Sequence, residues 1–340
     1  MSNPPKHILV IRLSAMGDVA MTVPVLRAFK AQYPDIKVTV LTRGFFKPFF
    51  RDLDGVTIFP ADLNNKHKGI FGLFALSKEL RAFNIDAIAD LHNVLRTKIL
   101  KTFLSDIKCI QIDKGRAEKR ALVSGKIFEQ LKTTHQRYRD VFEKLGCPIT
   151  SLEPIFPPRS SLNNSILDIV GRNTKSWIGI APFAAHKSKM YPLELMEEVI
   201  KQLAKDHKLL LFGGKADADY LNTLQSENVS SIAGKLNLDE ELDVISNLDV
   251  MVSMDSGNAH MAAMMGIKVL TLWGVTHPYA GFYPFHQDKD FSLLADRSKY
   301  PKIPTSIYGN KFPVGYEECM QTISPLAIVK KVEDIIKKPH

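Results

Sequence analysis

Short runs of β-branched and other apolar residues alternate with helical patterns along most of this 340-residue chain. In the first part, the apolar runs predict strands at residues 7–13, 37–42, 55–59, 86–91 and 108–112, and the helical patterns lie at 18–32, 70–83, 94–104 and 127–145. Such alternation is typical of parallel α/β sheets, because each strand returns to the sheet through a helix. The order of the elements therefore indicates doubly wound α/β layers.

The alternation is interrupted once. Residues 146–158 predict an extended connection because they contain several prolines, namely Pro148, Pro154, Pro157 and Pro158. The pattern then restarts, with strands predicted at 176–181, 208–212, 229–233, 249–253 and 268–273 and helices around 193–205, 216–226, 238–247 and 257–265. A chain of this length can form two domains that each bury a core. We therefore expect two doubly wound domains, with the carboxyl ends of their strands lining a ligand-binding cleft.

Composition excludes several classes of protein. Hydrophobic residues make up 45% of the chain, yet no apolar run approaches the roughly 20 residues that a membrane helix needs. The run at 7–13 does not predict a secretory signal, because Arg12 interrupts it and no small-residue cleavage site follows. Cys109, Cys147 and Cys319 offer neither a disulfide framework nor a zinc pattern. We therefore expect a cytoplasmic enzyme.

Positive charge is concentrated in the first half of the chain. Residues 1–150 carry 25 Lys and Arg against 14 Asp and Glu, a net charge of +11, whereas the remainder carries 20 against 22, a net charge of −2. The excess gathers in three clusters: Arg96, Lys98 and Lys101; Lys114, Arg116, Lys119, Arg120 and Lys126; and Lys132, Arg137 and Arg139. A solvated helix face would explain any one cluster, but together they indicate attraction to a polyanion, either nucleic acid or an anionic lipid head group.

The segment 250–276 predicts a strand, a tight turn, a helix and a second strand, with polar groups gathered at the turn. The strand ends at Asp255, and the helix that follows begins near Gly257 with unpaired N–H groups and the positive end of its dipole. Gly257 permits close approach of a ligand, Ser256 offers a hydroxyl, and His260 lies one turn further along the same face. These features predict a diphosphate site, although Asp and Ser also serve as ordinary helix caps.

Three further strand-end loops carry candidate chemistry. In the loop 12–18, Gly17 permits a sharp turn and Asp18 starts the next helix, where a carboxylate serves either as a cap or as a reactive group. The loop 181–192 contains lysines that would either neutralise phosphate or form an ordinary basic surface loop. The loop 211–217 has two glycines followed by Asp217, which is either an acid placed to accept ribose hydroxyls or part of a plain turn and helix start. None of these loops contains the Gly-x-Gly-x-x-Gly pattern of dinucleotide-binding folds.

Several of these motifs occur together in an order that resembles a known family. They are the run I-R-L-S-A-M-G-D-V-A-M-T-V-P-V-L at 11–26, the K-x-Y-P step at 189–192, the G-G-x-x-D turn at 213–217, A-G-K at 233–235 and D-S-G-x-x-H-x-A-A-x-x-G at 255–266. Each is weak alone, but five in order over nearly the whole chain resemble glycosyltransferase family 9, the ADP-heptose:lipopolysaccharide heptosyltransferases. The segments 90–96 and 318–320 also resemble family segments.

The resemblance implies a GT-B fold of two Rossmann-like domains facing a cleft. The expected division is an acceptor-binding domain at 1–160, a nucleotide-sugar-binding domain at 161–322, and a final helix within 323–340 that crosses back to the first domain. The family's general base corresponds to Asp18. Its donor-binding residues correspond to Lys189, Gly214, Asp217, Asp255, Ser256, Gly257 and His260. Three departures put the exact donor in doubt: Met254 and Tyr191 replace the usual Asn and Trp, and residues 183–188 lack paired hydroxyl residues.

These assignments predict an inverting glycosyl transfer. Asp18 would accept the proton of an acceptor hydroxyl as its oxygen attacks the anomeric carbon. Lys189, the Ser256 and Gly257 amides and His260 would stabilise the departing diphosphate, so we expect no metal and no other cofactor. The D-x-D tripeptides at 52–54 and 217–219 are short enough to occur by chance. The acceptor would be an anionic glycolipid, the Kdo and lipid A inner core, contacted by Arg12, Arg96, Lys98, Arg116, Arg120, His135 and Arg137.

Other functions remain open. A lipid acceptor implies peripheral contact with the cytoplasmic face of the inner membrane. The donor could be another nucleotide sugar, and a sugar-nucleotide epimerase could share the fold and the donor turn. A nucleic-acid-binding protein would explain the basic first half, but it would leave Asp18 and the turn at 255–260 without a purpose, and aromatic residues are not interleaved with the basic clusters. We therefore expect no nucleic-acid partner.

Overall fold

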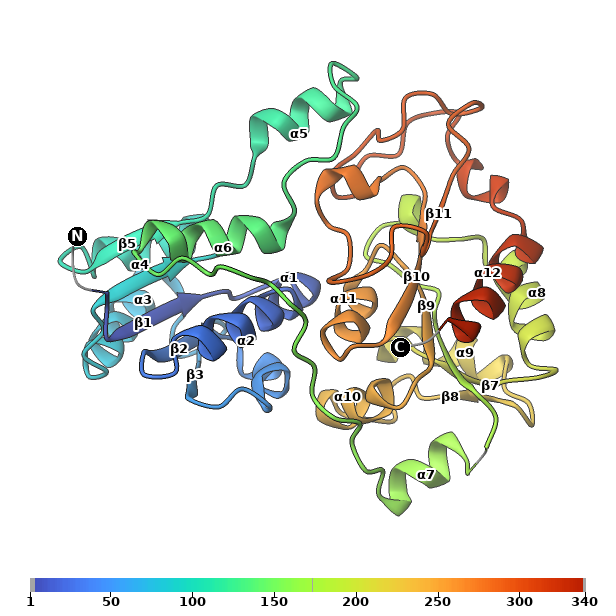
Figure 1. The fold of residues 1–340 in the computed structure, drawn as a ribbon, viewed down its shortest axis with the longest axis horizontal. Coiled ribbons are helices and arrows are strands. Elements are labelled where there is room, and N and C mark those ends of the chain that lie inside the picture. Colours follow the sequence, from blue (N-terminus) through green and yellow to red (C-terminus); the bar gives the residue numbers. More distant parts are fainter. Residues whose placement is uncertain (1–3, 173, 339–340) are drawn as a thin grey trace. The chain divides into compact units, whose positions relative to one another are not determined.

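The structure is a computed structural model that describes residues 4–172 and 174–338. Its contacts divide the chain into two compact units (Figure 1). Unit 1 comprises the chain up to Lys114 together with Thr133–Ile155, and unit 2 comprises Gly115–Lys132 and the chain from Phe156 onward. The segment 115–132, which we had placed in the first domain, therefore belongs to unit 2. Each unit is an α/β layer built on one parallel sheet, as the alternation predicts.

Unit 1 contains a five-stranded parallel sheet with the order β3-β2-β1-β4-β5. Its strands are β1 (His7–Ile11), β2 (Lys37–Thr42), β3 (Val56–Pro60), β4 (Ala87–Asp90) and β5 (Lys108–Gln111). The central strand β1 is continuously apolar after His7 and is buried from Ile8 to Ile11, because helices cover both faces of the sheet. The five strands lie at the predicted places.

Helices cover both faces of the unit 1 sheet. They are α1 (Met16–Ala20), α2 (Thr22–Gln32), α3 (Gly69–Arg81), α4 (Leu95–Thr102) and α6 (Thr134–Lys144), with a 3-10 helix η1 at Gly44–Phe50. Helices α3 and α4 pack together over Leu9 and Ile11, and α2 packs against α6 through the rings of Phe29 and Phe142, whose centroids are 4.7 Å apart. The core of unit 1 therefore lies on both sides of β1.

The predicted helix at 127–145 is shorter in the structure. It begins at Thr134 because Thr133 forms its N-cap, where the Thr133 hydroxyl accepts the Gln136 N–H at 3.2 Å and the Gln136 side chain accepts the Thr133 N–H at 2.8 Å. Residues 127–132 instead pack on unit 2. A separate helix α5, which we did not predict, occupies Arg116–Val123.

Unit 2 contains a six-stranded parallel sheet with the order β11-β10-β9-β6-β7-β8. Its strands are β6 (Trp177–Ala181), β7 (Lys208–Leu211), β8 (Val229–Ser231), β9 (Val250–Met254), β10 (Lys268–Trp273) and β11 (Ser292–Leu294). The short edge strand β11 is the one that the hydrophobic pattern did not predict. The neighbouring strands β6 and β9 occupy the centre and are almost completely buried.

The helices of unit 2 also lie on both faces of its sheet. They are α7 (Asn164–Val170), α8 (Leu193–Leu203), α9 (Ala218–Thr223), α10 (Leu238–Ser246), α11 (Gly257–Met264) and α12 (Pro325–Lys337), with 3-10 turns η2 (Lys187–Lys189), η3 (Lys215–Asp217), η4 (Pro278–Ala280) and η5 (Cys319–Thr322). Helices α10 and α11 pack together, and α11 lies on β9 and β10. Helices α8 and α12 pack on one another in the main apolar core.

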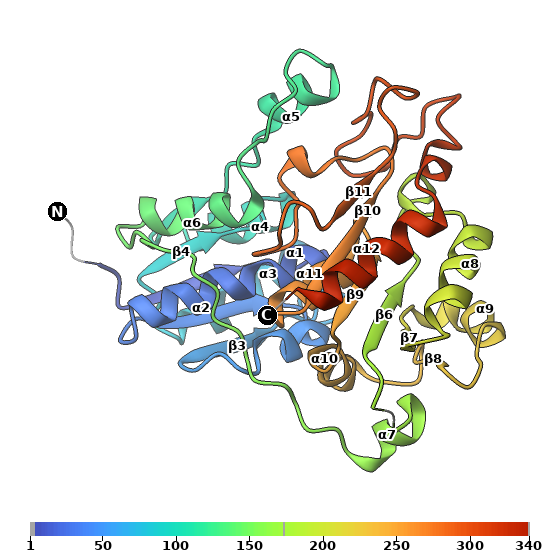
Figure 2. The same ribbon diagram turned by 45° about the vertical axis from the view of Figure 1, so that its right-hand side comes forward.

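The final helix α12 packs on α8, β9 and β10 of unit 2, and its crossing back to the first domain stays a prediction. Figure 2 shows α12 beside β9. Ile328, Val332 and Ile335 recur at helical spacing and are fully buried in the core that α12 shares with α8, β9 and β10. Ser324 caps the helix, since its hydroxyl accepts the Ala327 N–H at 3.2 Å, and Pro325 occupies the first turn.

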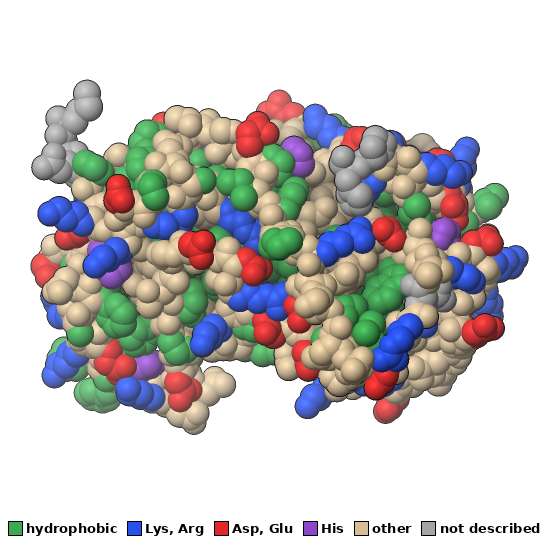
Figure 3. Space-filling model, turned by 60° about the horizontal axis from the view of Figure 1, so that its bottom comes forward, with side chains coloured by type: hydrophobic (Ala, Val, Ile, Leu, Met, Phe, Trp, Pro, Cys, Tyr) green, Lys and Arg blue, Asp and Glu red, His purple; other side chains and the backbone are tan. Residues whose placement is uncertain are grey.

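The segment 115–132 packs on the loops that follow β10. Leu122 and Leu131 form a small apolar cluster with Ala280, and the Leu131 N–H donates to the Tyr279 carbonyl at 3.0 Å. The Lys119 ammonium lies 4.2 Å from the centroid of the Phe282 ring. The basic residues of α5 therefore belong to unit 2. On the face shown in Figure 3, Lys and Arg side chains lie among acidic and uncharged residues rather than in one continuous basic area.

We predict that Ile328→Ala lowers the free energy of unfolding of unit 2 by roughly 2–5 kcal/mol, because it leaves a cavity among packed side chains. Leu326→Ala on the same helix is the matched control. Leu326 is 67% exposed, so the change should stay within about 0.5 kcal/mol. Both tryptophans, Trp177 and Trp273, lie in unit 2, so urea unfolding followed by tryptophan fluorescence reports on this unit. Equal effects of the two substitutions would contradict the packing of α12.

Candidate active site

The candidate base of unit 1 lies at the carboxyl edge of its sheet. The chain leaves β1 through Arg12 and enters α1, which contains Asp18. The neighbouring strand β4 ends at Asp90 and is followed by His92. Because β1 and β4 are adjacent and parallel, their two following loops lie side by side.

Asp18 is held by three groups of unit 1. Its carboxylate forms an ion pair with the Arg12 guanidinium and also accepts the Ala15 N–H at 3.3 Å. The Tyr138 hydroxyl donates to the Asp18 backbone carbonyl at 3.2 Å. The Asp18 side chain keeps 27% of its surface exposed, whereas that of Arg12 keeps 8%. Asp18 therefore caps the turn and still exposes part of its side chain to solvent, and its role as a base stays a prediction.

Arg12 links the two loops at this edge. Besides Asp18, its guanidinium donates to the Leu91 carbonyl at 2.7 Å and lies 6.0 Å from the centroid of the buried Tyr138 ring. Burial raises the pKa of the Tyr138 hydroxyl, so this group stays protonated and remains a donor. The structure thus places Arg12, a predicted acceptor contact, as the partner of Asp18. Its contact with an acceptor stays a prediction.

Asp90 organises the loop after β4. Its buried carboxylate accepts the N–H groups of His92 at 3.0 Å and Asn93 at 2.8 Å, and the Thr97 hydroxyl at 3.0 Å. The Lys101 ammonium, from one of the basic clusters, completes the set at 2.7 Å from Asp90. One member of that cluster is therefore part of a buried structural ion pair. The network fixes the backbone from which His92 extends.

His92 is a candidate site residue that the sequence analysis did not single out. It is 7% exposed, and its Nε2 lies 3.5 Å from the Ser14 hydroxyl in the loop that leads to Asp18. Burial, followed by the positive charges of Arg12 and Lys114, lowers the pKa of His92 to about 4. The imidazole is therefore neutral near pH 7. Its position directly after the strand predicted at 86–91 was the available signal.

The predicted acceptor contacts do not form one cluster. Arg96 and Lys98 are exposed on α4 of unit 1, and His135 and Arg137 are buried on α6. Arg116 and Arg120 are exposed on α5, which belongs to unit 2. Their contacts with an acceptor stay predictions.

The predicted donor residues Lys189 and Asp255 meet at the carboxyl edge of the unit 2 sheet. Lys189 follows β6 in the turn η2, and Asp255 follows the neighbouring strand β9. The Lys189 ammonium lies 2.9 Å from the Asp255 carboxylate, and the two side chains are 13% and 6% exposed. Low exposure strengthens such a pair and makes an unpaired partner costly. The sequence predicted both residues, and the structure brings them together.

A glycine confines the Lys189 side chain. The Ser188 hydroxyl donates to the Gly309 carbonyl, which holds the loop that contains Gly309 against η2. A Cβ built on Gly309 would lie 2.3 Å from the Lys189 Cδ, and the backbone there has a φ of +77°. A side chain at 309 would therefore displace Lys189. No sequence motif pointed to Gly309, because it lies 120 positions beyond the lysine.

The turn into α11 has the predicted form. Ser256 is the N-cap in extended conformation, Gly257 is the first helical residue, and His260 lies buried one turn later. The Ser256 hydroxyl lies 3.1 Å from the Ser253 hydroxyl and makes no capping hydrogen bond to the helix. The Ser256 side chain therefore leaves the amides at the start of α11 uncapped, and these amides can donate to another acceptor.

Gly214 and Asp217 lie in the turn after β7, next to β6 in the sheet. The Gly214 N–H donates to the Asp217 Oδ2 at 2.8 Å, so this carboxylate closes its own turn. The other carboxylate oxygen of the half-buried Asp217, Oδ1, does not bind the Gly214 N–H. The turn therefore lies on the same edge as Lys189 and Asp255.

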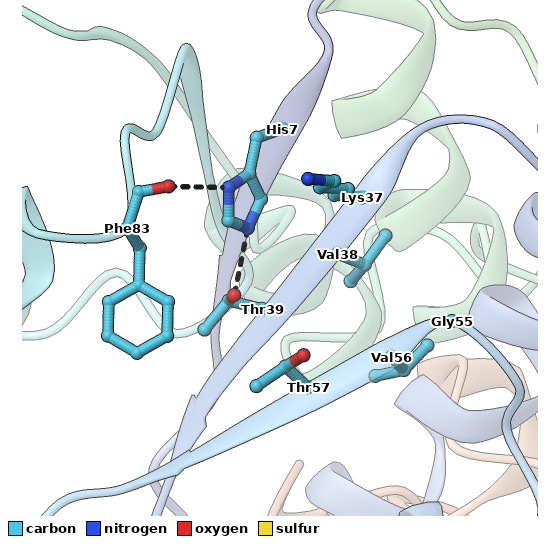
Figure 4. Close-up of a pocket in the computed structure, with 8 residues that line it drawn as sticks. All are labelled: His7, Lys37, Val38, Thr39, Gly55, Val56, Thr57 and Phe83. Atoms are coloured by element: carbon cyan, nitrogen blue, oxygen red, sulfur yellow. Dashed lines mark hydrogen bonds between the residues drawn. The ribbon is translucent and has the colours of Figure 1, made fainter.

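A separate pocket of about 610 Å³ lies at the amino ends of β1, β2 and β3, which is the opposite edge of the unit 1 sheet (Figure 4). Its lining residues are His7, Lys37, Val38, Thr39, Gly55, Val56, Thr57 and Phe83. Both nitrogens of His7 are engaged, by the Phe83 carbonyl and the Thr39 hydroxyl, each at 2.8 Å. The residues predicted to act in chemistry do not line this pocket.

Comparison with known proteins identifies the family. The chain matches glycosyltransferase family 9 (heptosyltransferase) over residues 73–308. It belongs to this family. The resemblance found in the sequence is thereby confirmed, and the protein is a glycosyltransferase.

Relatives and solved structures agree. The lipopolysaccharide core heptosyltransferase OpsX of Haemophilus influenzae is 24% identical over 298 residues, which cover 81% of this chain and 80% of that protein. A family 9 glycosyltransferase from Veillonella parvula superposes with a TM-score of 0.77 at 19% identity and covers 99% of this chain and 98% of its own. E. coli heptosyltransferase WaaC, solved with ADP, gives 0.68 at 19% identity, with 97% and 99% covered. The GT-B fold class, with two Rossmann-like units, is confirmed.

Two kinds of feature are absent from residues 4–172 and 174–338. No helix in that part of the chain has the length and apolar character required to cross a membrane. In the same residues, no three His, Cys, Asp or Glu side chains are grouped so that they could hold a metal ion.

We predict that His92 titrates near pH 4 rather than near the usual 6.5. NMR titration of the imidazole resonances measures this, and the His92→Gln spectrum assigns the signal. Arg12→Gln should raise the pKa of His92, because it removes a nearby positive charge. Arg43→Gln, at an exposed position, is the control and should leave that pKa unchanged. Titration of wild-type His92 between pH 6 and 7 would contradict the site geometry.

Proposed function

We propose that this enzyme is an inverting, metal-independent heptosyltransferase. It would move a heptose from ADP-heptose to the inner core of lipopolysaccharide, a Kdo- or heptose-bearing lipid A. The observation that carries the proposal is the pairing of Lys189 with Asp255 beside the uncapped start of α11, which is a preformed site for a diphosphate. Membership of family 9 and the names of the relatives support heptose as the sugar.

Unit 1 would supply the base. The Asp18 carboxylate accepts the proton of an acceptor hydroxyl while that oxygen forms a bond to the anomeric carbon of the donor. The bond from the anomeric carbon to the diphosphate oxygen breaks at the same time, and its electron pair leaves with the nucleotide. A single displacement inverts the anomeric configuration. Arg12 holds the Asp18 carboxylate in place through the ion pair and through Leu91.

Unit 2 would hold the donor. The Lys189 ammonium is paired with the Asp255 carboxylate. A diphosphate would share that ammonium, and the Ser256 and Gly257 amides at the start of α11 would meet its remaining oxygens. His260, one turn along α11, is the proposed further contact. The free oxygen of Asp217 would accept ribose hydroxyls, while its other oxygen keeps the Gly214 turn closed.

The proposed reaction uses no metal and no other cofactor, because the fixed positive groups of unit 2 would carry the charge that develops on the leaving diphosphate. The chain contains two D-x-D tripeptides, at 52–54 and 217–219, a pattern that binds metal in other glycosyltransferases. Asp52 lies near Arg27 and Arg51, at 4.0 and 3.7 Å. Asp217 is engaged with Gly214. Neither pattern is needed for the proposed step.

The proposed location is the cytoplasm, with peripheral contact at the cytoplasmic face of the inner membrane. A lipid-linked acceptor favours such contact. No nucleic-acid partner is proposed, because the basic residues are divided between the two units.

We predict that Asp18→Asn lowers turnover by roughly 10²- to 10⁴-fold and leaves donor binding largely intact, because the base acts in the chemical step. Asp219→Asn, in the first turn of α9, is the control and should keep full turnover. The assay follows ADP release with acceptor present and is run in EDTA. Near-normal turnover of Asp18→Asn would refute the base, and loss of wild-type turnover in EDTA with recovery in manganese would refute metal independence.

We predict that Lys189→Gln weakens ADP binding by about 10- to 100-fold, the value expected when a charge-assisted contact is lost. Gln keeps a donor for the buried Asp255, and tryptophan fluorescence checks that unit 2 remains folded. Lys187→Gln in the same turn is the matched control, since Lys187 is exposed and should not change the affinity. Calorimetric titration with ADP, UDP, GDP and CMP also tests the nucleotide. Preference for another nucleotide would contradict ADP-heptose, and equal effects of both variants would contradict the role of Lys189.

A further inference from the structure

The first turns of α3 expose large apolar side chains. Ile70 is 61% exposed, Phe71 is 90% exposed and Phe74 is 44% exposed, all on the outer side of the helix. The inner side already packs in the core through Leu73, Leu76 and Leu80. Burial within unit 1 therefore does not account for the outer residues. A contiguous exposed apolar patch of this kind marks an interaction surface.

A second helix extends this patch. Helices α3 and α4 pack together, and the Phe74 ring lies 5.3 Å from the Phe103 ring just after α4. Leu95 is 74% exposed and lies at the opposite end of α4 from Phe103, at the carboxyl edge of the sheet where the first turn of α3 also begins. We call Ile70, Phe71, Phe74 and Leu95 the α3–α4 patch.

The patch lies at the same edge of the unit 1 sheet as the proposed base. Helix α3 follows β3 and helix α4 follows β4, so the first turns of both begin at the carboxyl edge of the parallel sheet. Asp18 lies in the helix that follows β1 at that edge. A surface bound to the α3–α4 patch would therefore be presented to the acceptor side of unit 1.

Basic residues surround the patch. Lys66 and Lys68 precede α3, Lys78 lies on its outer side, and Arg96 and Lys98 follow Leu95 on α4; all five are exposed. The Lys78 ammonium lies 4.5 Å from the centroid of the Phe74 ring. The acidic residues that face this region are Glu79 and Asp62. Glu79 is paired with Lys66 at 3.1 Å, and Asp62 accepts the Asn65 N–H at 3.1 Å. The excess charge around the patch is positive.

We propose that the α3–α4 patch docks unit 1 on the surface of a bilayer that contains anionic lipids. Phe71, Ile70 and Leu95 would enter the boundary between head groups and acyl chains, and the surrounding lysines and arginines would bind the anionic head groups. Apolar side chains with cations around them are the pattern of interfacial helices, whereas a protein partner would be expected to offer a partly polar, shape-matched surface.

This inference deepens the proposed function, because a glycolipid acceptor is itself held in a bilayer. Docking at the carboxyl edge of unit 1 would bring Asp18 to the membrane surface where acceptor hydroxyls are displayed. The cationic surface around the patch and a lipid-linked acceptor thus both favour an anionic bilayer as the partner of the α3–α4 patch.

Sedimentation with vesicles tests the proposal without catalysis. The full-length wild type should bind vesicles of phosphatidylglycerol and phosphatidylcholine and should bind pure phosphatidylcholine far more weakly. The double substitution Ile70→Ser with Phe71→Ser should lower the partition coefficient by at least about tenfold, because it removes the inserted apolar groups. Lys68→Ser with Lys78→Ser should lower it by about fivefold per lysine and weaken its dependence on salt.

Matched controls lie in unit 2. Val314→Ser removes a side chain that is 95% exposed, and Lys299→Ser with Lys302→Ser removes two exposed cations. Both controls should bind vesicles as the wild type does. Circular dichroism checks that the α3 variants are folded. No binding of the wild type to anionic vesicles, or equal losses in patch and control variants, would overturn the proposal.

ADP titration of the same variants separates this proposal from the proposed function. The α3 variants should bind ADP with wild-type affinity, because the donor residues lie in unit 2. Vesicle binding without ADP binding would contradict the proposed donor and leave the docking surface intact. ADP binding without vesicle binding would refute the docking surface alone.

Discussion

Parallel strand pairing is the constraint on which the candidate site of each unit depends. In a parallel sheet every strand ends at the same edge, so loops far apart in the chain meet there. In unit 1 this brings Ser14, in the loop that leads from β1 to Asp18, beside His92 after β4. In unit 2 it brings Lys189 after β6 beside Asp255 after β9. Helices on both faces bury the strands from which these loops extend.

In each unit the charged side chain that we propose to act in the reaction forms an ion pair. Arg12 is paired with Asp18, and Lys189 with Asp255. Such pairs limit the cost of placing charges in poorly hydrated loops, and their geometry holds both partners in fixed orientations. The partners differ in what they leave open: Asp18 keeps a solvent-exposed carboxylate, whereas Lys189 is confined by Gly309. The proposed chemistry uses this difference: the exposed Asp18 carboxylate would accept a proton from the acceptor, and the confined Lys189 ammonium would bind the diphosphate.

Much of this arrangement follows from local patterns in the sequence. Strands buried on both faces, such as β1 and β9, are continuous apolar runs, so their limits were predicted within a residue or two. The donor turn was recognisable because Asp255, Ser256 and Gly257 are consecutive. Features that depend on distant contacts were missed. Helix α5 and the extended stretch 127–132 are stabilised by residues 279–282, about 150 positions away. The ion pair between Arg12 and Asp18, and the burial that keeps His92 neutral, also arise from tertiary packing.

The most direct test of the central claim is product analysis. Purified enzyme is incubated with ADP-heptose and a Kdo-bearing lipid A acceptor, and the products are analysed by mass spectrometry and by NMR of the anomeric centre. The account predicts an acceptor that carries one added heptose, an equal amount of ADP, and an anomeric configuration opposite to that of the donor. Retention of configuration would contradict direct displacement. Conversion of the nucleotide sugar without any acceptor would indicate an epimerase and contradict glycosyl transfer.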